Sequence, residues 1–146
     1  EPAHALRNLI KTEINISEKT GTPVSFAMTR LVASGAAEDD SEFALVRETW
    51  RNMISGQLGP GKHLHWAGID TLLIMAVGGN PVGLDHHLAS VRNELESGEL
   101  ESKSKSDLSM AYSILTYPFD VDSAKKVSIK LSSRLFYDAS EIKFTQ

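Results

Sequence analysis

The residues best suited to chemistry surround one short turn within the segment His63–Met75. Two apolar, strand-like runs flank the turn Ala67-Gly68-Ile69-Asp70, which is the pattern of a β-hairpin. The carboxylate of Asp70 could bind a divalent metal ion, or it could hydrogen-bond to the turn backbone, as aspartates in turns commonly do. The turn role is favoured, because Mg²⁺ usually requires further carboxylates or phosphates beside a single aspartate.

Two pairs of histidines are the other candidate metal ligands. His63 and His65 alternate along the first run, so on a strand they share one face, and a His-x-His pair can bind a metal ion. No third ligand is identifiable, and the competing interpretation is an exposed strand face beside the turn. His86 and His87 are adjacent in a helical pattern, where neighbouring side chains diverge, so we expect both at the surface. We therefore predict neither a metal site nor a cofactor.

The elements that must position this hairpin follow from the spacing of apolar residues. Apolar side chains recur every three or four positions in residues 5–19 and around Trp50, which predicts helices with Trp50 in the core. Residues 24–32 and 108–117 are apolar runs of strand length. The full predicted order is helix 5–19, strand 24–32, a helix carrying Phe43, Val46, Trp50, Met53 and Ile54, the hairpin to Val77, a helix carrying Leu84, Leu88, Val91 and Leu95, strand 108–117, and a final helix carrying Ala124, Val127, Leu131 and Leu135.

This order predicts an α+β fold with a ferredoxin-like or palm-type β-α-β-β-α-β sheet and helices packed mainly on one face. The 146 residues suit a single domain, 1–146. Because the chain opens directly in a helical pattern, we expect it to have been cut from a longer, multidomain protein.

The composition excludes several classes of function. A formal net charge of −4 argues against general nucleic-acid binding, which normally needs a basic surface. The chain has no cysteine, so it has no disulfide framework and no thiolate metal site. No apolar run reaches the ~18 residues of a membrane span. We expect a cytoplasmic domain, or the cytoplasmic part of a membrane protein.

Four segments, in their order and spacing, resemble the GGDEF domain of diguanylate cyclases over nearly the whole chain. Lys19–Phe26 is similar to the helix end, Gly-x-Pro turn and first strand of that family, and His65–Thr71 stands where the family has Arg-Tyr-Gly-Gly-Asp-Glu-Phe. Leu108–Pro118 resembles the late strand that ends in Tyr-Pro, and Leu135–Ala139 resembles the Ala-Leu-Tyr-x-Ala stretch of the last helix. The resemblance implies the fold of enzymes that use two divalent metal ions to join two GTP molecules into cyclic di-GMP.

The resemblance also implies that the residues this chemistry needs are replaced. The family's metal ligand at the end of its first strand corresponds to Arg30, a cation where an anion is required. The hairpin acids correspond to Ile69 and Asp70, of which only Asp70 could bind a metal. The segment 33–42, which corresponds to the family's guanine-reading region, is shorter and contains no asparagine. The resemblance therefore implies a degenerate, catalytically inactive domain with a vestigial hairpin.

The family's phosphate-binding and inhibitory positions are replaced as well. Its triphosphate lysine corresponds to Ser140 and the following arginine to about Phe144. Its Arg-x-x-Asp inhibitory site, which binds cyclic di-GMP, corresponds to Leu58 and Gly61, and neither side chain can do this. Arginine suits phosphate because its guanidinium pairs with it in a bidentate manner. Any anion site would therefore have to use other cations, for which the candidates are Arg51, Lys62 and Arg92.

We therefore expect a non-catalytic regulatory domain that acts through contacts with a protein partner or with other domains of its parent chain, in a cyclic di-GMP-linked signalling or exopolysaccharide-secretion system. A homodimer or heterodimer is compatible with this role. The alternative function is a receptor for cyclic di-GMP or GTP that uses a nonstandard site, and a residual enzyme using Asp70 ranks third. Trp66, beside the turn, is expected either to be semi-buried or to serve as an exposed anchor for a partner.

Overall fold

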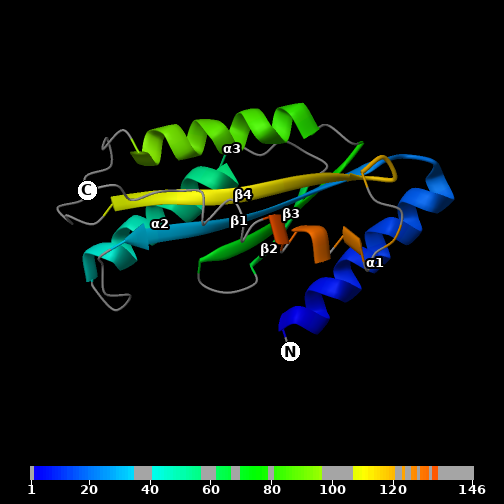
Figure 1. Ribbon diagram of the computed structural model, residues 1–146, viewed down its shortest axis with the longest axis horizontal. Helices are drawn as coiled ribbons and strands as arrows, with labels where there is room; N and C mark the ends of the chain where they lie inside the picture. Colours follow the sequence, from blue (N-terminus) through cyan, green and yellow to red (C-terminus); the bar gives the residue numbers. More distant parts are fainter. Residues whose placement is uncertain are drawn as a thin grey trace.

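A four-stranded antiparallel sheet in the order β2-β3-β1-β4 forms the centre of the protein (Figure 1). The structure is a computed structural model and describes residues 2–34, 41–56, 62–66, 70–78, 81–96, 107–120, 123, 126–127, 129–131 and 133–134. The elements are α1 (Pro2–Thr20), β1 (Val24–Ser34), α2 (Ser41–Gly56), β2 (Lys62–Trp66), β3 (Thr71–Val77), α3 (Pro81–Glu96) and β4 (Asp107–Tyr117). The predicted order and the palm-type fold class are confirmed.

The central strand β1 is mostly apolar because a strand pairs with it on each side and helices pack against both of its faces. It pairs with β3 from Val24↔Val77 to Arg30↔Thr71, and with β4 from Val24↔Tyr117 to Ser34↔Asp107. Side chains on both faces of a strand in this position meet other elements, which explains a run without the usual alternation of polar residues. The predicted strand stops two residues early, since the small side chains of Ala33 and Ser34 give no sign of the pairing with β4.

Helices α2 and α3 cover one face of the sheet (Figure 1). Trp50 and Ile54 of α2 are fully buried there, which confirms the predicted core position of Trp50. The periodic residues of α3 are buried as predicted, at Leu84, Leu88, Val91 and Leu95. They pack against sheet residues that point the same way, namely Ala27, Leu31, Leu72, Ile74, Ala76 and Met110.

The opposite face is covered in part by α1. Ile10 and Ile14 pack against alternate sheet residues such as Phe26 and Met75, together with Val127 and Leu131. The last two belong to the predicted final helix, whose described positions between 126 and 134 are helical, while Ala124 and Leu135 lie outside the described residues. The structure thus adds a second, partial layer, so that helices pack against both faces of the sheet.

Helix α1 ends at the predicted glycine. Gly21 has a φ of 73°, a left-handed conformation that glycine adopts without steric cost, and its N–H donates to the Ser17 carbonyl at 2.8 Å. The Tyr117 hydroxyl of β4 donates to the Glu18 carboxylate at 2.5 Å and fixes the same end of the helix to the sheet. Among the described residues, none of the helices has both the length and the apolar character that crossing a bilayer requires.

One buried polar pair joins β1 to β4. The hydroxyls of Ser25 and Thr116 lie 2.9 Å apart, and both residues are almost completely buried. Ser25→Ala is expected to lower the free energy of unfolding by about 1–2 kcal/mol, because it leaves the Thr116 hydroxyl buried without its partner. Urea unfolding measures this. The double variant with Thr116→Val should lose less than the sum of the single variants, and strictly additive losses would contradict the coupling.

Candidate functional site

The hairpin holds Asp70 against the central strand. Residues 62–66 of β2 pair with β3 up to Trp66↔Leu72, and Asp70 precedes β3 directly. The Asp70 carbonyl accepts a 2.9 Å hydrogen bond from the Leu31 N–H of β1. This bond extends the ladder between β1 and β3 by one position and fixes the backbone of Asp70. The other residues of the predicted turn, Ala67, Gly68 and Ile69, lie outside the described residues.

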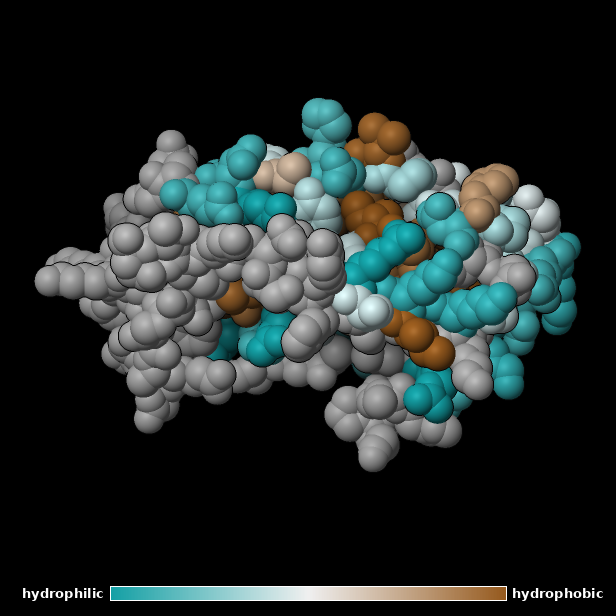
Figure 2. Space-filling view, viewed as in Figure 1, coloured by the Kyte–Doolittle hydropathy of each residue, from teal (hydrophilic) through white to brown (hydrophobic). Residues whose placement is uncertain are grey.

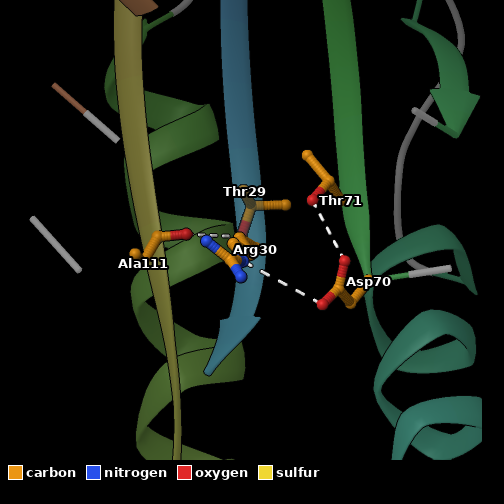
Figure 3. Close-up of polar contacts among 5 residues, drawn as sticks. All are labelled: Thr29, Arg30, Asp70, Thr71 and Ala111. Carbon is orange, nitrogen blue, oxygen red and sulfur yellow. Dashed lines mark hydrogen bonds and ion pairs between the residues drawn. The ribbon is translucent and has the colours of Figure 1, made fainter. Parts of the chain in front are cut away.

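Arg30 and Asp70 form an ion pair across this junction (Figure 3). The Arg30 Nε lies 3.9 Å from the Asp70 Oδ2, and the Thr71 hydroxyl donates to the Asp70 Oδ1 at 3.2 Å. The side chains are 52% and 30% exposed, so the pair contributes about 0–1 kcal/mol to stability. Its chemical consequence is larger, because a permanent cation lies beside the one described carboxylate of the hairpin.

Thr29 fixes the strand from which Arg30 projects. Its hydroxyl is buried and donates to the Ala111 carbonyl of β4 at 2.9 Å (Figure 3). Side chains alternate along a strand, so Arg30 lies on the face that α1 covers in part, with Met28, whereas Thr29 lies on the face of α2 and α3. Figure 3 shows the ion pair in front of the sheet and a helix behind it. On this face the Arg30 side chain is about half exposed to solvent.

The histidines do not form a metal site in the described part of the chain. His63 and His65 pair with Met75 and Leu73 and share a face as predicted, with His63 exposed and His65 half-buried. No group of three His, Cys, Asp or Glu side chains that could hold a metal ion occurs among the described residues. His86 is exposed as predicted. The prediction for His87 was wrong, because its Nε2 lies 2.9 Å from the Ile54 carbonyl and the ring is half-buried between α3 and α2.

The three candidate cations for an anion site do not converge. Arg92 lies over the Tyr112 ring, 4.5 Å from its centroid, and its Nε donates to the Met110 carbonyl of β4 at 2.8 Å. Arg51 lies over Trp66 of β2, and Lys62 begins that strand. Since β2 and β4 are opposite edges of the sheet, Arg92 cannot share a site with the other two. Sequence spacing gives no information on strand order. For this reason Arg51, Lys62 and Arg92 were grouped together as candidates for an anion site.

Sequence analysis missed the contacts around Trp66. The ring of Trp66 meets the buried ring of Trp50 edge-on, with centroids 5.8 Å apart and planes at 71°. The Arg51 guanidinium lies 4.2 Å from the centroid of Trp66. Trp66 is half-buried, in agreement with the semi-buried alternative. The adjacency of Trp50 and Arg51 in α2 was the only signal, and it does not reveal that β2 brings a second indole to both.

The positions that correspond to the family's inhibitory and triphosphate sites lie outside the described residues. These are Leu58, Gly61, Ser140 and Phe144. The loop expected at residues 97–106 also lies outside them, as do residues 35–40 of the shortened segment. The described site consists of the Arg30–Asp70 pair on one face and the Arg51–Trp66 contact on the other.

Comparison with known proteins identifies the fold. The sequence matches no protein-family model and no curated protein. The structure is similar to the FimX GGDEF domain of Pseudomonas aeruginosa, with a TM-score of 0.76 and 14% identity over 92% of this chain and 86% of that one. The fold is that of GGDEF domains. The GGDEF resemblance seen in the sequence is thereby confirmed at the level of the fold.

Two further GGDEF-fold structures extend the comparison. The active GGEEF domain of a diguanylate cyclase from Vibrio cholerae has a TM-score of 0.76 and 7% identity, over 94% of this chain and 90% of that one. The GGDEF domain of DgcB from Caulobacter crescentus, in complex with c-di-GMP, has a TM-score of 0.70 and 13% identity, over 94% and 82%. The same fold thus occurs in an active cyclase domain and in a complex with the dinucleotide, so the chemistry of this chain must be argued from its own residues.

Proposed function

We propose that this chain is a catalytically inactive GGDEF-fold domain that regulates a cyclic di-GMP-linked signalling or exopolysaccharide-secretion system through protein contacts. The observation that carries the proposal is the ion pair between Arg30 and Asp70. Two-metal phosphoryl chemistry needs several anionic oxygens around the ions, so that both the attacking and the leaving oxygen are stabilised. Among the described residues, the charged group that lies beside the hairpin carboxylate is the guanidinium of Arg30.

The charge of Arg30 opposes metal binding in two ways. A guanidinium stays protonated at any pH that a folded protein tolerates, so its positive charge is permanent. Its Nε lies 3.9 Å from one oxygen of Asp70, and the Thr71 hydroxyl donates a hydrogen bond to the other oxygen. A divalent ion bound to Asp70 would therefore lie close to a like charge. One carboxylate under these conditions is a poor Mg²⁺ ligand set.

The surface offers apolar side chains for protein contacts. Six large ones stand at exposed positions among the described residues, and the three most exposed are Phe119 at 76%, Leu45 at 70% and Val82 at 69%. On the face shown in Figure 2, hydrophobic residues reach the surface in small separate groups between hydrophilic ones. Small patches of this kind suit a transient, regulatory contact better than a permanent interface, which is larger and more apolar. They support a role in which the domain is recognised by a partner.

Incubation of the purified domain with GTP and either Mg²⁺ or Mn²⁺, followed by mass-spectrometric detection of cyclic di-GMP, tests the proposal. We expect no product above the level of a protein-free sample. The active GGEEF domain from Vibrio cholerae serves as the positive control under the same conditions. Product from this chain that disappears in Asp70→Ala would establish the residual-enzyme alternative and overturn the proposal.

A further inference from the structure

In the described part of the chain, Arg51 and Arg92 lie over aromatic rings, and they differ in what their N–H groups contact. Arg92 lies over Tyr112, its Nε donates to the Met110 carbonyl, and the Tyr112 hydroxyl donates to Asp85 at 3.1 Å. Every part of that arrangement has a protein partner, as expected for a contact that closes the edge of a sheet. Arg92 is therefore a structural arginine.

Arg51 makes the same ring contact without such partners. Its guanidinium lies 4.2 Å from the centroid of the Trp66 ring, and in the described part of the chain it has no hydrogen bond and no ion pair. Glu48, one turn earlier on α2, forms no ion pair with it. The guanidinium lies against the ring at a half-buried position, and no described residue accepts a hydrogen bond from its N–H groups.

The elements that carry Arg51 and Trp66 also carry other N–H donors and cations. Trp50 is fully buried, and its indole N–H has no protein acceptor among the described residues. Arg47 lies four residues before Arg51, and so on the same side of α2. Lys62 shares a strand face with Trp66, because the two residues are four positions apart on β2. Fixed donors and local positive charge favour an oxyanion with more than one negative charge.

We propose that Arg51, held over Trp66, binds a phosphate group on the α2 side of strand β2. The guanidinium supplies two parallel N–H donors to two phosphate oxygens, and the Trp50–Trp66 contact keeps the Trp66 ring in place. The phosphate could be that of a nucleotide or a free phosphate ion. The inference does not depend on the proposed lack of catalysis, because the Arg30–Asp70 pair lies on the other face of the sheet.

Nuclear magnetic resonance of the two tryptophan indole N–H groups tests this directly, because the chain contains only two tryptophans. The intact domain is titrated with inorganic phosphate, pyrophosphate, cyclic di-GMP and, as a carboxylate control, acetate. We expect the Trp66 signal to move saturably with pyrophosphate at millimolar concentrations or below, and to move little with acetate. A lower dissociation constant for cyclic di-GMP than for pyrophosphate assigns the phosphate to a nucleotide, and the reverse order assigns it to a free phosphate ion.

Matched variants separate the site from general charge effects. Arg51→Met should raise the dissociation constant at least about tenfold, because it removes charge-assisted hydrogen bonds. Arg51→Lys should restore it only in part, since a lysine keeps the charge but lacks the planar pair of donors. Arg92→Met removes the same charge and should leave it unchanged. The proposal is overturned if no signal moves at about 10 mM ligand, or if Arg51→Met and Arg92→Met have equal effects.

Discussion

The Arg30→Asp variant is expected to bind Mn²⁺, which the wild-type domain is expected not to do at about 10 mM. The substitution removes the cation that contacts Asp70 and places a second carboxylate on β1, next to the hairpin acid. Two carboxylates from neighbouring strands can hold a divalent ion with water completing its coordination. We expect a dissociation constant of about 1 mM or lower, measured by calorimetry or by paramagnetic broadening of the Thr71 amide signal.

The stability of the same variant provides a second readout. Without metal, the introduced carboxylate and that of Asp70 repel each other, so the melting temperature should fall slightly below that of the wild type. Adding Mn²⁺ should raise it, because the ion binds only the folded state. Arg30→Ala removes the cation without adding a carboxylate. Its melting temperature should show neither the decrease without metal nor the increase with Mn²⁺. Addition of Asp70→Asn to Arg30→Asp should abolish the binding, and binding that survives this change would place the metal elsewhere.

This result would show that one side chain separates the present hairpin from a metal site. The backbone around Arg30 is held independently of the ion pair, by the Leu31–Asp70 hydrogen bond and by the bond from Thr29 to Ala111. The exposed pair itself contributes little to stability. The fold of this chain therefore does not depend on the ion pair beside Asp70, and we expect it to persist when Arg30 is replaced.

The elements of this fold could be predicted because each has its own local pattern. The apolar spacing of Leu84, Leu88, Val91 and Leu95 gives α3 directly, and the glycine before Pro23 gives the end of α1. The layer formed by α1 on the second face could not be read in the same way. The pattern of an amphipathic helix shows that one side is buried, but not which face of the sheet buries it.

The residues of the candidate site could be predicted from the sequence, but the contacts between them could not. Arg30 and Asp70 were each singled out by position, but their ion pair depends on the register that places Arg30 opposite Thr71. A shift by one residue would have turned Arg30 to the other face of the sheet. Arg51 and Arg92 looked alike in sequence, since both are arginines on amphipathic helices. Only the strand order, with β2 and β4 at opposite edges, shows that they serve different rings.

Trp50→Ala is expected to cause the largest loss of stability. The side chain is fully buried among α2, α3 and the sheet, and it also contacts the ring of Trp66. Removal of a buried indole eliminates its burial energy and leaves a cavity, which together lower the free energy of unfolding by about 3–5 kcal/mol. This is a large part of the roughly 5–15 kcal/mol that is typical of a domain, so urea unfolding should show a much lower midpoint.

The control for this prediction lies on the same helix. Leu45 of α2 is 70% exposed, so Leu45→Ala should change the free energy of unfolding by no more than about 0.5 kcal/mol. Trp50→Phe keeps an aromatic ring and should stay folded, which allows its effect on Trp66 to be measured. Because Trp50 supports the ring that orients Arg51, Trp50→Phe should also weaken the response of Trp66 to pyrophosphate.

Two outcomes would contradict these expectations. Equal stability losses for Trp50→Ala and Leu45→Ala would show that Trp50 does not hold α2 to the sheet. An unchanged response of Trp66 to pyrophosphate in Trp50→Phe would show that Arg51 is positioned without Trp50.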